Sequence, residues 1–363
     1  MPPEMRKAHP YYVYDAIQAQ PELIEKTLRK RSAIELASDA VAERERIFFI
    51  GIGTSLHAAR VAESWMREFS AGRILAHAEQ SFEIGHHPIA FTPDDAVIVI
   101  THTGTTTASV EALRMAHAAG ALTLAITGEM SGEVVRCADF QIETCEQEVA
   151  FAYTKSYTTA LAALALLIVR ITERRKLLAR GYSGEEIARV PALIREALNL
   201  EPQVRELAKQ ISPLARIEIF GTGVGWPTAC EAALKIKEAC YIAAEGFETE
   251  EILHGPFSET DSRAALIGLL TGRETDGRAR QILSAAGELK MLRAAIAGPS
   301  ANHNISAEKI LVVPETPEWL TAFVHLVPLQ FLTYFVALER GLNPDTGRQD
   351  QPAHAAASRH YKY

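Results

Sequence analysis

One pattern occurs twice in this chain and constrains its fold more than any other feature. The apolar run 47–50 enters the turn Gly51-Ile52-Gly53-Thr54-Ser55, and a helical pattern follows. About 170 residues later, the apolar run 217–220 enters the turn Gly221-Thr222-Gly223-Val224-Gly225, again before a helical pattern. A buried strand, a tight glycine turn and a helix are the opening of a βαβ unit. The repetition therefore predicts two domains of one kind, related by internal duplication.

Further apolar runs fit strands that alternate with helices. They lie at 96–100, 122–126, 265–270 and 309–313, and a helix is expected at 109–119. Strands that alternate with helices indicate a parallel sheet covered on both faces. The expected fold class is α/β, with two doubly wound, flavodoxin-like domains.

The remaining segments suggest where the domains begin and end. We expect an N-terminal helical segment at 1–45, a first domain at 46–180, a helical connection at 181–210, a second domain at 211–342 and a tail at 343–363. The tail is polar and has no clear period. It is expected to be either disordered or packed over the active site.

Charge and composition argue against several classes of function. The net charge of −8 does not favour non-specific nucleic-acid binding, which needs a basic surface. The N-terminus has no signal-peptide pattern, and the longest apolar run, 160–169, is shorter than the ~20 residues that span a bilayer, so we expect a core helix there. The four cysteines lack C-x-x-C spacing, which is typical of reduced cytosolic thiols. We expect a cytoplasmic protein with no metal and no membrane partner.

Two hydroxyl-rich turns could hold an anion. Thr54 and Ser55 open the helix after the first strand, and Thr101-His102-Thr103-Gly104-Thr105-Thr106 follows the strand at 96–100. The N-terminus of a helix favours negative charge, and ligands of open α/β sheets bind at the carboxyl ends of strands. The alternative is that these side chains only cap helices. Neither turn is a Walker A loop or a complete dinucleotide fingerprint.

Three charged residues share one face of the helix expected from about Pro227 to Ala243. Glu231, Lys235 and Glu238 stand at positions i, i+4 and i+7. The ordinary explanation of this spacing is a solvated face with ion pairs. The other explanation is a set of groups that act on a ligand.

The segment after this helix favours the chemical explanation. Residues 245–256 form an acidic stretch, expected as a loop, that ends in His254-Gly255-Pro256. A histidine can move a proton at the ring oxygen of a sugar, and a carboxylate can shuttle a proton between C1 and C2.

These residues resemble the sugar isomerase (SIS) domain family, in the form found in the isomerase half of glucosamine-6-phosphate synthase. The similarity runs from about residue 11 to 345 and is most specific around the lysine, glutamate and histidine described above. The matching stretches are 14–17 with Gln20-Pro21, 53–55, 103–106, 154–155 with 158–159, 233–238, 241–245, 251–256 and 327–330. The resemblance implies two SIS domains, a homodimer, and an active site near a subunit boundary.

The resemblance also implies roles for individual residues. The phosphate of the sugar would be held by Ser55, Thr101, His102, Thr103 and Thr106. Glu238 would shuttle the C1/C2 proton with Lys235 as its electrostatic partner, and His254 of the neighbouring subunit would open the sugar ring. Further candidates are Gly53, Thr54, Ala152, Glu231 and Lys362. No cofactor and no metal are implied.

The chain departs from the family in three places. The SIS region begins almost directly after the initiator methionine, so glutamine-dependent transamination is not expected. His102 replaces an amide, and Tyr153 replaces a serine of the phosphate loop. The synthase tail carries a Schiff-base lysine, where this chain has Pro352 or Ala357, depending on the alignment; Lys362 is the only lysine of its tail.

The expected function is conversion of glucosamine 6-phosphate and water to fructose 6-phosphate and ammonia. This reaction passes through a ring-opened imine and needs neither a glutaminase nor an enzyme lysine. The alternatives within the same chemistry are a deglycase of fructosamine 6-phosphate and an aldose–ketose phosphate isomerase. The alternative from another class is a non-catalytic sugar-phosphate sensor, although such regulators usually carry a helix-turn-helix, and this chain has no basic N-terminal module.

Overall fold

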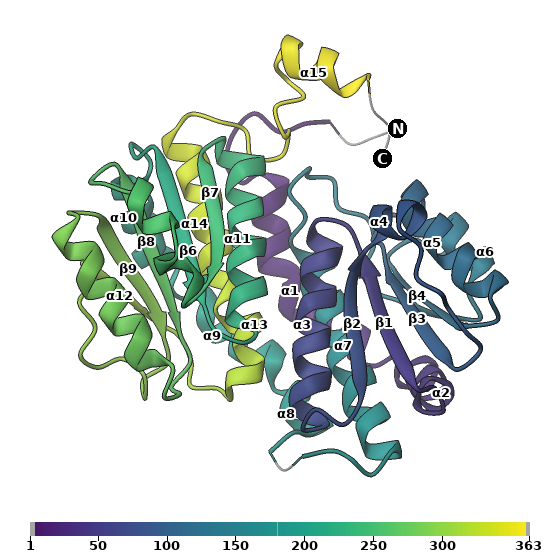
Figure 1. The fold of residues 1–363 in the computed structure, drawn as a ribbon. Coiled ribbons are helices and arrows are strands. Elements are labelled where there is room, and N and C mark those ends of the chain that lie inside the picture. Colours follow the sequence, from purple (N-terminus) through teal and green to yellow (C-terminus); the bar gives the residue numbers. More distant parts are fainter. Residues whose placement is uncertain (1–3, 180, 361–363) are drawn as a thin grey trace. The chain divides into compact units, whose positions relative to one another are not determined.

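The chain forms two compact units, each built around one parallel five-stranded sheet (Figure 1). The computed structural model describes residues 4–179 and 181–360. The first unit comprises 20–148, 155–179 and 181–191, and the second comprises 4–19, 149–154 and 192–360. Helix α1 (Tyr12–Leu28) begins in the second unit and ends in the first, and α9 (Val190–Leu198) leads back.

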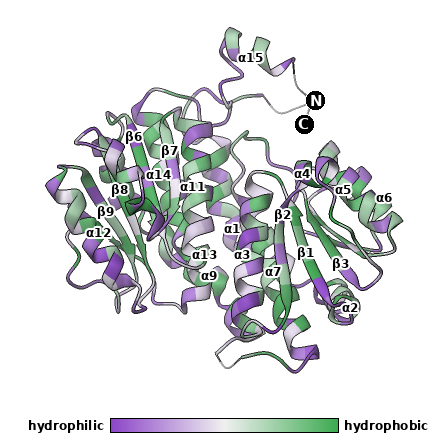
Figure 2. Ribbon diagram, viewed as in Figure 1, coloured by the Kyte–Doolittle hydropathy of each residue, from purple (hydrophilic) through white to green (hydrophobic). Residues whose placement is uncertain are grey.

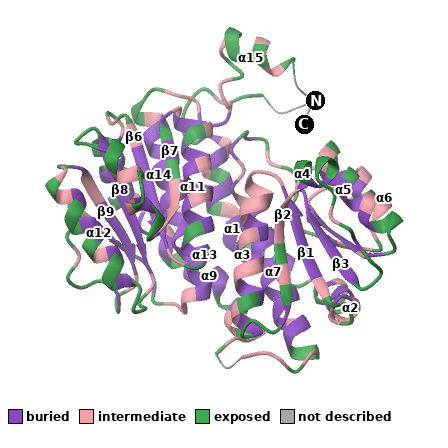
Figure 3. Cartoon of the chain, in the orientation of Figure 1, coloured by how far each residue is buried: buried purple, intermediate pink, exposed green. Residues whose placement is uncertain are grey.

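The first sheet has the strand order β2-β1-β3-β4-β5. Its strands are β1 (Arg46–Gly51), β2 (Leu75–Gln80), β3 (Asp95–Ile100), β4 (Leu122–Thr127) and β5 (Phe140–Glu143). One face is covered by α2 (Arg31–Ala42), α3 (Thr54–Phe69) and α7 (Lys155–Arg174), and the other by α4 (Ser81–His86), α5 (Thr107–Ala118) and α6 (Glu133–Cys137) (Figure 1). Because helices cover both faces, β1 and β3 are apolar and buried along almost their whole length (Figures 2 and 3).

The second sheet has the strand order β7-β6-β8-β9-β10. Its strands are β6 (Arg216–Gly221), β7 (Ala243–Glu248), β8 (Ala264–Leu270), β9 (Leu292–Ala297) and β10 (Lys309–Val312). One face carries α11 (Gly225–Cys240) and α14 (Leu326–Glu339), with α10 (Glu201–Ile211) and α13 (Thr321–Val324) beside them. The other face carries α12 (Asp276–Glu288) and the 3₁₀ turns η1 (Glu251–Leu253) and η2 (Pro256–Glu259) (Figure 1). The remaining elements are α8 (Gly184–Ala188), η3 (Glu318–Leu320) and α15 (Pro352–Ser358).

The two sheets have the same topology. In each, the first strand of the unit lies between the second and third, and the fourth and fifth follow in order at the far side. This confirms the expected fold class of two doubly wound α/β domains with parallel sheets. The domain boundaries proposed from the sequence stay predictions.

Four strands were not predicted from the sequence: β2, β5, β7 and β9. The clearest correction is β7, whose residues were expected to form a helix end and an acidic loop. Helix α11 ends at Cys240 because Tyr241 adopts the left-handed conformation, with φ 57° and ψ 35°. Gly246 then allows α11 to lie close to β7, since a Cβ at Gly246 would stand 2.3 Å from the Cys230 nitrogen.

Within residues 4–179 and 181–360, two segments are long and apolar enough to cross a membrane, yet both are core elements. In the apolar window of Lys155–Arg174, 89% of the residues are buried inside the fold, and in that of Glu318–Glu339 the share is 100%. The helix expected around residues 160–169 is thus confirmed as a buried core helix.

Glu218 is a buried carboxylate in the middle of β6. The residue is 0% exposed, and within the described part of the chain neither of its oxygens has a hydrogen-bond partner. Arg216 Nη1 lies 3.9 Å from Glu218 Oε1. Burial raises the pKa of Glu218 to about 7; Arg216 opposes this rise, and Glu259 and Glu245 add to it.

This carboxylate makes stability depend on pH in a definite direction. Because its pKa is higher in the folded state, the folded protein binds more protons than the unfolded chain between the ordinary glutamate value and pH 7, so stability falls as pH rises through that window. We expect the free energy of unfolding of wild type, relative to Glu218→Gln, to fall by up to about 3 kcal/mol between pH 4.5 and 8. Urea denaturation of both proteins at several pH values measures this difference. A difference that is independent of pH would contradict the account of Glu218.

Candidate active site

The two hydroxyl-rich turns flank the point where the strand order of the first sheet reverses. Strand β2 lies on one side of β1, and β3 lies on the other. The connection that leaves β1 and the connection that leaves β3 therefore run in opposite directions across the sheet. These two strands pair in parallel, and their carboxyl ends meet at one edge. The turn at 51–55 and the loop at 101–106 therefore lie at the place where open α/β sheets bind ligands.

The turn after β1 needs its glycines. Gly53 has φ 57° and ψ −124°, and a Cβ at Gly51 would lie 2.5 Å from the carbonyl carbon of Ser55. Helix α3 begins at Thr54, so Thr54 and Ser55 stand in its first turn, at the positive end of the helix dipole. Both are partly exposed, so a ligand can reach them.

The loop after β3 gathers threonine hydroxyls. Thr101 is buried and its Oγ1 lies 3.5 Å from that of Thr106, while Thr105 Oγ1 lies 3.2 Å from that of Thr103. Gly104 has φ 67°, and a Cβ there would stand 3.2 Å from the Glu129 carbonyl oxygen, so the loop folds tightly against the turn after β4. The result is a compact group of neutral hydroxyls before α5.

His102 lies in this loop, but its ring packs inward. Its Nε2 accepts a hydrogen bond from the Glu148 backbone N–H at 3.2 Å, and a Cβ at Gly128 would stand 2.6 Å from its Nδ1. Glu148 in turn accepts from the backbone N–H and hydroxyl of Ser156 at the start of α7. Burial lowers the pKa of His102, so its ring is favoured in the neutral form. The ring thereby joins two loops of the first unit. The sequence pattern does not predict this inward position of the His102 ring.

The charged stripe of α11 contains a buried lysine between two carboxylates. Lys235 is 3% exposed, and its Nζ lies 2.5 Å from Glu238 Oε2 and 3.7 Å from Glu231 Oε1. Glu231 is buried, whereas the Glu238 side chain keeps 20% of its surface exposed. The stripe is therefore not the solvated face that the spacing also allowed. It presents one partly open carboxylate backed by a fixed positive charge.

The C-terminal tail is attached at the end of this same helix. The Tyr241 hydroxyl accepts a hydrogen bond from the Arg348 backbone N–H at 2.8 Å, and the Arg348 guanidinium lies 4.3 Å from the centre of the Tyr241 ring. Asp345 accepts from the N–H groups of Tyr12 and Val13 at the start of α1. The first part of the tail is thus ordered and contacts Tyr241, which lies three residues beyond Glu238. The sequence did not predict this contact.

The other tail and loop candidates fall in less informative places. Pro352 and Ala357 both lie in α15, and Lys362 lies outside the described residues. Ala152 is buried in the segment 149–154 of the second unit.

His254 is far from Glu238 within the second unit. Helix α11 starts at the carboxyl end of β6 and runs back along the sheet, which places Glu238 ~20 Å from that edge. His254 follows the carboxyl end of β7, and its loop packs on the opposite face of the sheet, with Ile252 in the cluster that contains Phe220. The His254 side chain is 67% exposed, 3.7 Å from Glu250. A site that uses both groups cannot be built from one copy of this unit.

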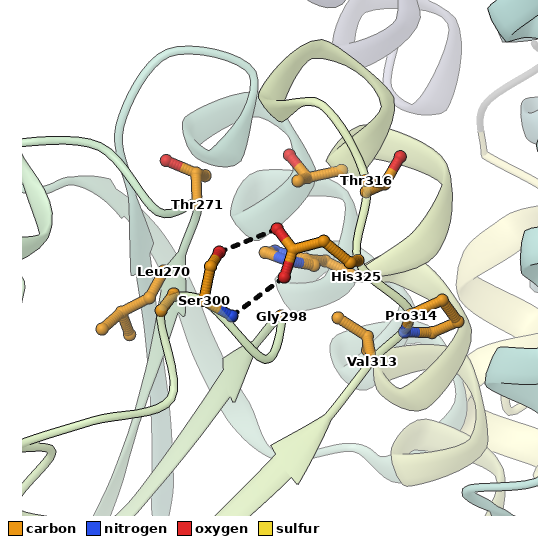
Figure 4. Close-up of a pocket in the computed structure, with 11 residues that line it drawn as sticks. Leu270, Thr271, Gly298, Ser300, Val313, Pro314, Thr316 and His325 are labelled. Carbon is orange, nitrogen blue, oxygen red and sulfur yellow. Dashed lines mark hydrogen bonds between the residues drawn. The ribbon is translucent and has the colours of Figure 1, made fainter.

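The carboxyl edge of the second sheet is filled by its own carboxylates. Asp276 accepts from the backbone N–H groups of Thr271 and Gly272, at 3.0 and 2.7 Å, and Glu318 pairs with Arg273. In the hollow that Figure 4 shows, Glu315 accepts from the N–H and hydroxyl of Ser300, at 2.9 and 2.7 Å. Several donors at this edge are thus engaged by carboxylates, whereas the buried Thr271 Oγ1 and Thr316 Oγ1 have no hydrogen-bond partner among the described residues. Because carboxylates repel an anion, this edge is less suited to a phosphate than the hydroxyl-rich edge of the first sheet.

Comparisons with known proteins agree with this architecture. Residues 40–170 match the family described as SIS domain. The chain is 30% identical over 353 residues to the glutamine–fructose-6-phosphate aminotransferase of Thermococcus kodakarensis, covering 94% of this chain and 58% of that protein. It is 30% identical over 359 residues to that of Gloeobacter violaceus, covering 93% and 57%. The chain thus spans less than two thirds of the length of these relatives.

A solved structure extends the likeness to the whole fold. The C-terminal domain of glucosamine-fructose-6-phosphate aminotransferase from Francisella tularensis has a TM-score of 0.87 at 23% identity, covering 94% of this chain and 99% of that one. The chain belongs to the SIS domain family, and along almost its whole length it is similar to the isomerase region of these aminotransferases.

Proposed function

We propose that this protein is a sugar-phosphate deaminase-isomerase that converts glucosamine 6-phosphate and water to fructose 6-phosphate and ammonium. The observation that carries the proposal is the Lys235–Glu238 pair, with Nζ and Oε2 2.5 Å apart. A carboxylate held beside a buried ammonium stays ionised and can accept a proton from carbon. The partly exposed side chain of Glu238 gives a substrate access to it.

Phosphate binding fixes the sugar in the proposed reaction. The hydroxyls of Ser55, Thr101, Thr103 and Thr106, with the N-terminus of α3, would hold the phosphate. His102 would support this loop from within through its contact with the Glu148 N–H. Binding energy from the non-reacting phosphate can then be used to orient C1 and C2.

The proton movements balance without a cofactor. The ring of glucosamine 6-phosphate opens when O5 gains a proton and the C1 hydroxyl loses one, a task proposed for His254. Glu238 then takes the proton from C2 and returns it to C1. Because the C1 oxygen gains a proton and the C2 amine loses one in the same conversion, C1 becomes an alcohol and C2 an imine. Water adds to that imine and ammonium leaves, giving fructose 6-phosphate. No enzyme lysine is needed, in keeping with Pro352 and Ala357 at the alternative positions of the Schiff-base residue.

A thermal-shift screen of hexose 6-phosphates and amino-sugar 6-phosphates tests the substrate class. Glucosamine 6-phosphate and fructose 6-phosphate are expected to raise the melting temperature, because a ligand that binds only the folded state stabilises it. The unphosphorylated sugars serve as controls and should have little effect. Stabilisation by fructosamine 6-phosphate alone would instead favour the deglycase.

Substitutions in the two turns test where the phosphate binds. Ser55→Ala and Thr103→Val remove hydroxyls that would contact a non-reacting group, so each should raise KM more than it lowers kcat. We expect KM to rise by roughly tenfold for each, as for the loss of one hydrogen bond to a charged group. Steady-state kinetics measure both constants, with the exposed Thr105→Val as a matched control. Full affinity in both variants would mean that the phosphate binds elsewhere.

A further inference from the structure

We propose that Glu218 is a proton-responsive positioning residue, which controls how firmly the loop that carries His254 is held against the second sheet. The link to catalysis rests on the function proposed above. The link to the loop itself rests on the ion pairs and burial of the second unit.

The loop from Glu250 to Glu259 is fastened at both ends by arginines. At its start, Glu250 pairs with Arg278 of α12, with Nη2–Oε1 at 2.6 Å and Nε–Oε2 at 2.7 Å. At its end, Glu259 pairs with Arg216 at the beginning of β6, at 2.5 Å. His254 lies between these two attachments. Any change at either arginine therefore changes the segment that presents the histidine.

Glu218 competes for the second attachment. Arg216 and Glu218 are two residues apart on β6, so their side chains share one face of the strand. The same Arg216 Nη1 that lies 2.5 Å from Glu259 lies 3.9 Å from Glu218 Oε1. An ionised Glu218 without any other partner would draw the guanidinium away from Glu259. A protonated Glu218 leaves it in place.

Among the described residues that shift the pKa of Glu218, Arg216 is the one cation. On β7 the side chain in register with it is Glu245, which adds negative charge, and on β8 it is Leu266. The strand β8 contributes no charged side chain, and in the turn before it Arg263 pairs with Asp261. From η2 comes Glu259 itself. Burial raises the pKa of Glu218 to about 7, so the competition is resolved near neutral pH.

The direction of the effect follows from these contacts. Below neutral pH, Glu218 is protonated, Arg216 stays with Glu259, and the loop is held. Above neutral pH, the ionised Glu218 draws Arg216 inward and the η2 end of the loop is released. The hydrogen bonds to follow are those donated by the N–H groups of Leu253, His254 and Ser258 inside the loop.

Hydrogen exchange of the full chain, without substrate, tests the proposal. We expect the protection of peptides covering 250–260, corrected for the intrinsic effect of pH, to be roughly fivefold lower at pH 8 than at pH 6, as for the loss of one ion pair. In Glu218→Gln this dependence should disappear. The matched control Glu245→Gln, a neighbouring and exposed carboxylate on β7, should keep it. Unchanged protection in wild type, or a dependence that survives in Glu218→Gln, would overturn the proposal.

A second measurement uses the wild-type protein alone and covers the case of a variant that does not fold. Carbon-13 NMR of glutamate side-chain carboxyls should show one group that titrates near neutral pH. Its absence would also overturn the proposal. Neither experiment requires turnover, so a failure of the proposed enzymatic function would be recognised separately, by inactivity toward glucosamine 6-phosphate with the exchange result intact.

Discussion

Glu238→Gln is expected to lower kcat by ~10²–10⁴-fold while sugar-phosphate binding is retained. The amide fills the volume of the carboxylate but cannot accept a proton from C2. The fold should persist, because Lys235 still has Glu231 at 3.7 Å. Steady-state assays give kcat, thermal shifts with fructose 6-phosphate report binding, and the melting temperature without ligand reports folding.

A matched control separates a proton shuttle from a general loss of charge. Glu245→Gln removes an exposed carboxylate from the other face of the second sheet and should leave kcat unchanged. Turnover like that of wild type in Glu238→Gln would assign the shuttle to another carboxylate. Glu251, which precedes His254 by three residues, would be the first to test.

Mixing Glu238→Gln with His254→Ala is expected to restore activity to two inactive proteins. Glu238 lies ~20 Å along α11 from the carboxyl edge of the second sheet, whereas His254 lies at that edge and on the opposite face, so a site that uses both must draw them from two copies of the chain. We propose a two-fold dimer for this purpose. Random exchange of subunits gives about half mixed dimers, each with one intact site, so about a quarter of the wild-type sites should return.

The mixing experiment has a clear contrary result. Light scattering tests for the proposed dimer, and tagged subunits test whether exchange has taken place. If both single variants are inactive and the exchanged mixture stays inactive, His254 does not complete a site in a second copy. If the His254→Ala protein is active by itself, His254 is not needed for catalysis and serves only to shape the turn before Gly255 and Pro256.

The sequence identified the elements that combine a strong apolar run with a glycine turn. Strands β1, β3, β6 and β8 are buried on both faces. Their apolar composition predicts this burial without knowledge of the neighbouring strands. The stripe of α11 was equally visible, because its spacing alone puts Glu231, Lys235 and Glu238 on one face.

The strands that were missed carry weaker local signals. Edge strands β2 and β7 are polar on at least one side, and β9 is rich in alanine, which has low strand propensity. The inward orientation of His102 depends on the space left by Gly128, which comes from a different strand connection. The competition between Glu218 and Glu259 for Arg216 likewise depends on the contact between Arg216 of β6 and Glu259 of η2, which lie far apart in the sequence. No local pattern predicts that contact.

The reaction itself is the most direct test of the proposed function. Incubation of the protein with glucosamine 6-phosphate, followed by NMR in deuterated water, reports the sugar, its C1 and C2 hydrogens and the ammonium formed. The account predicts fructose 6-phosphate and ammonium in equal amounts, with solvent deuterium at C1 where the Glu238 proton exchanges before its return. Unchanged glucosamine 6-phosphate, with isomerisation of an unaminated hexose phosphate instead, would contradict the deaminase and leave an aldose–ketose isomerase.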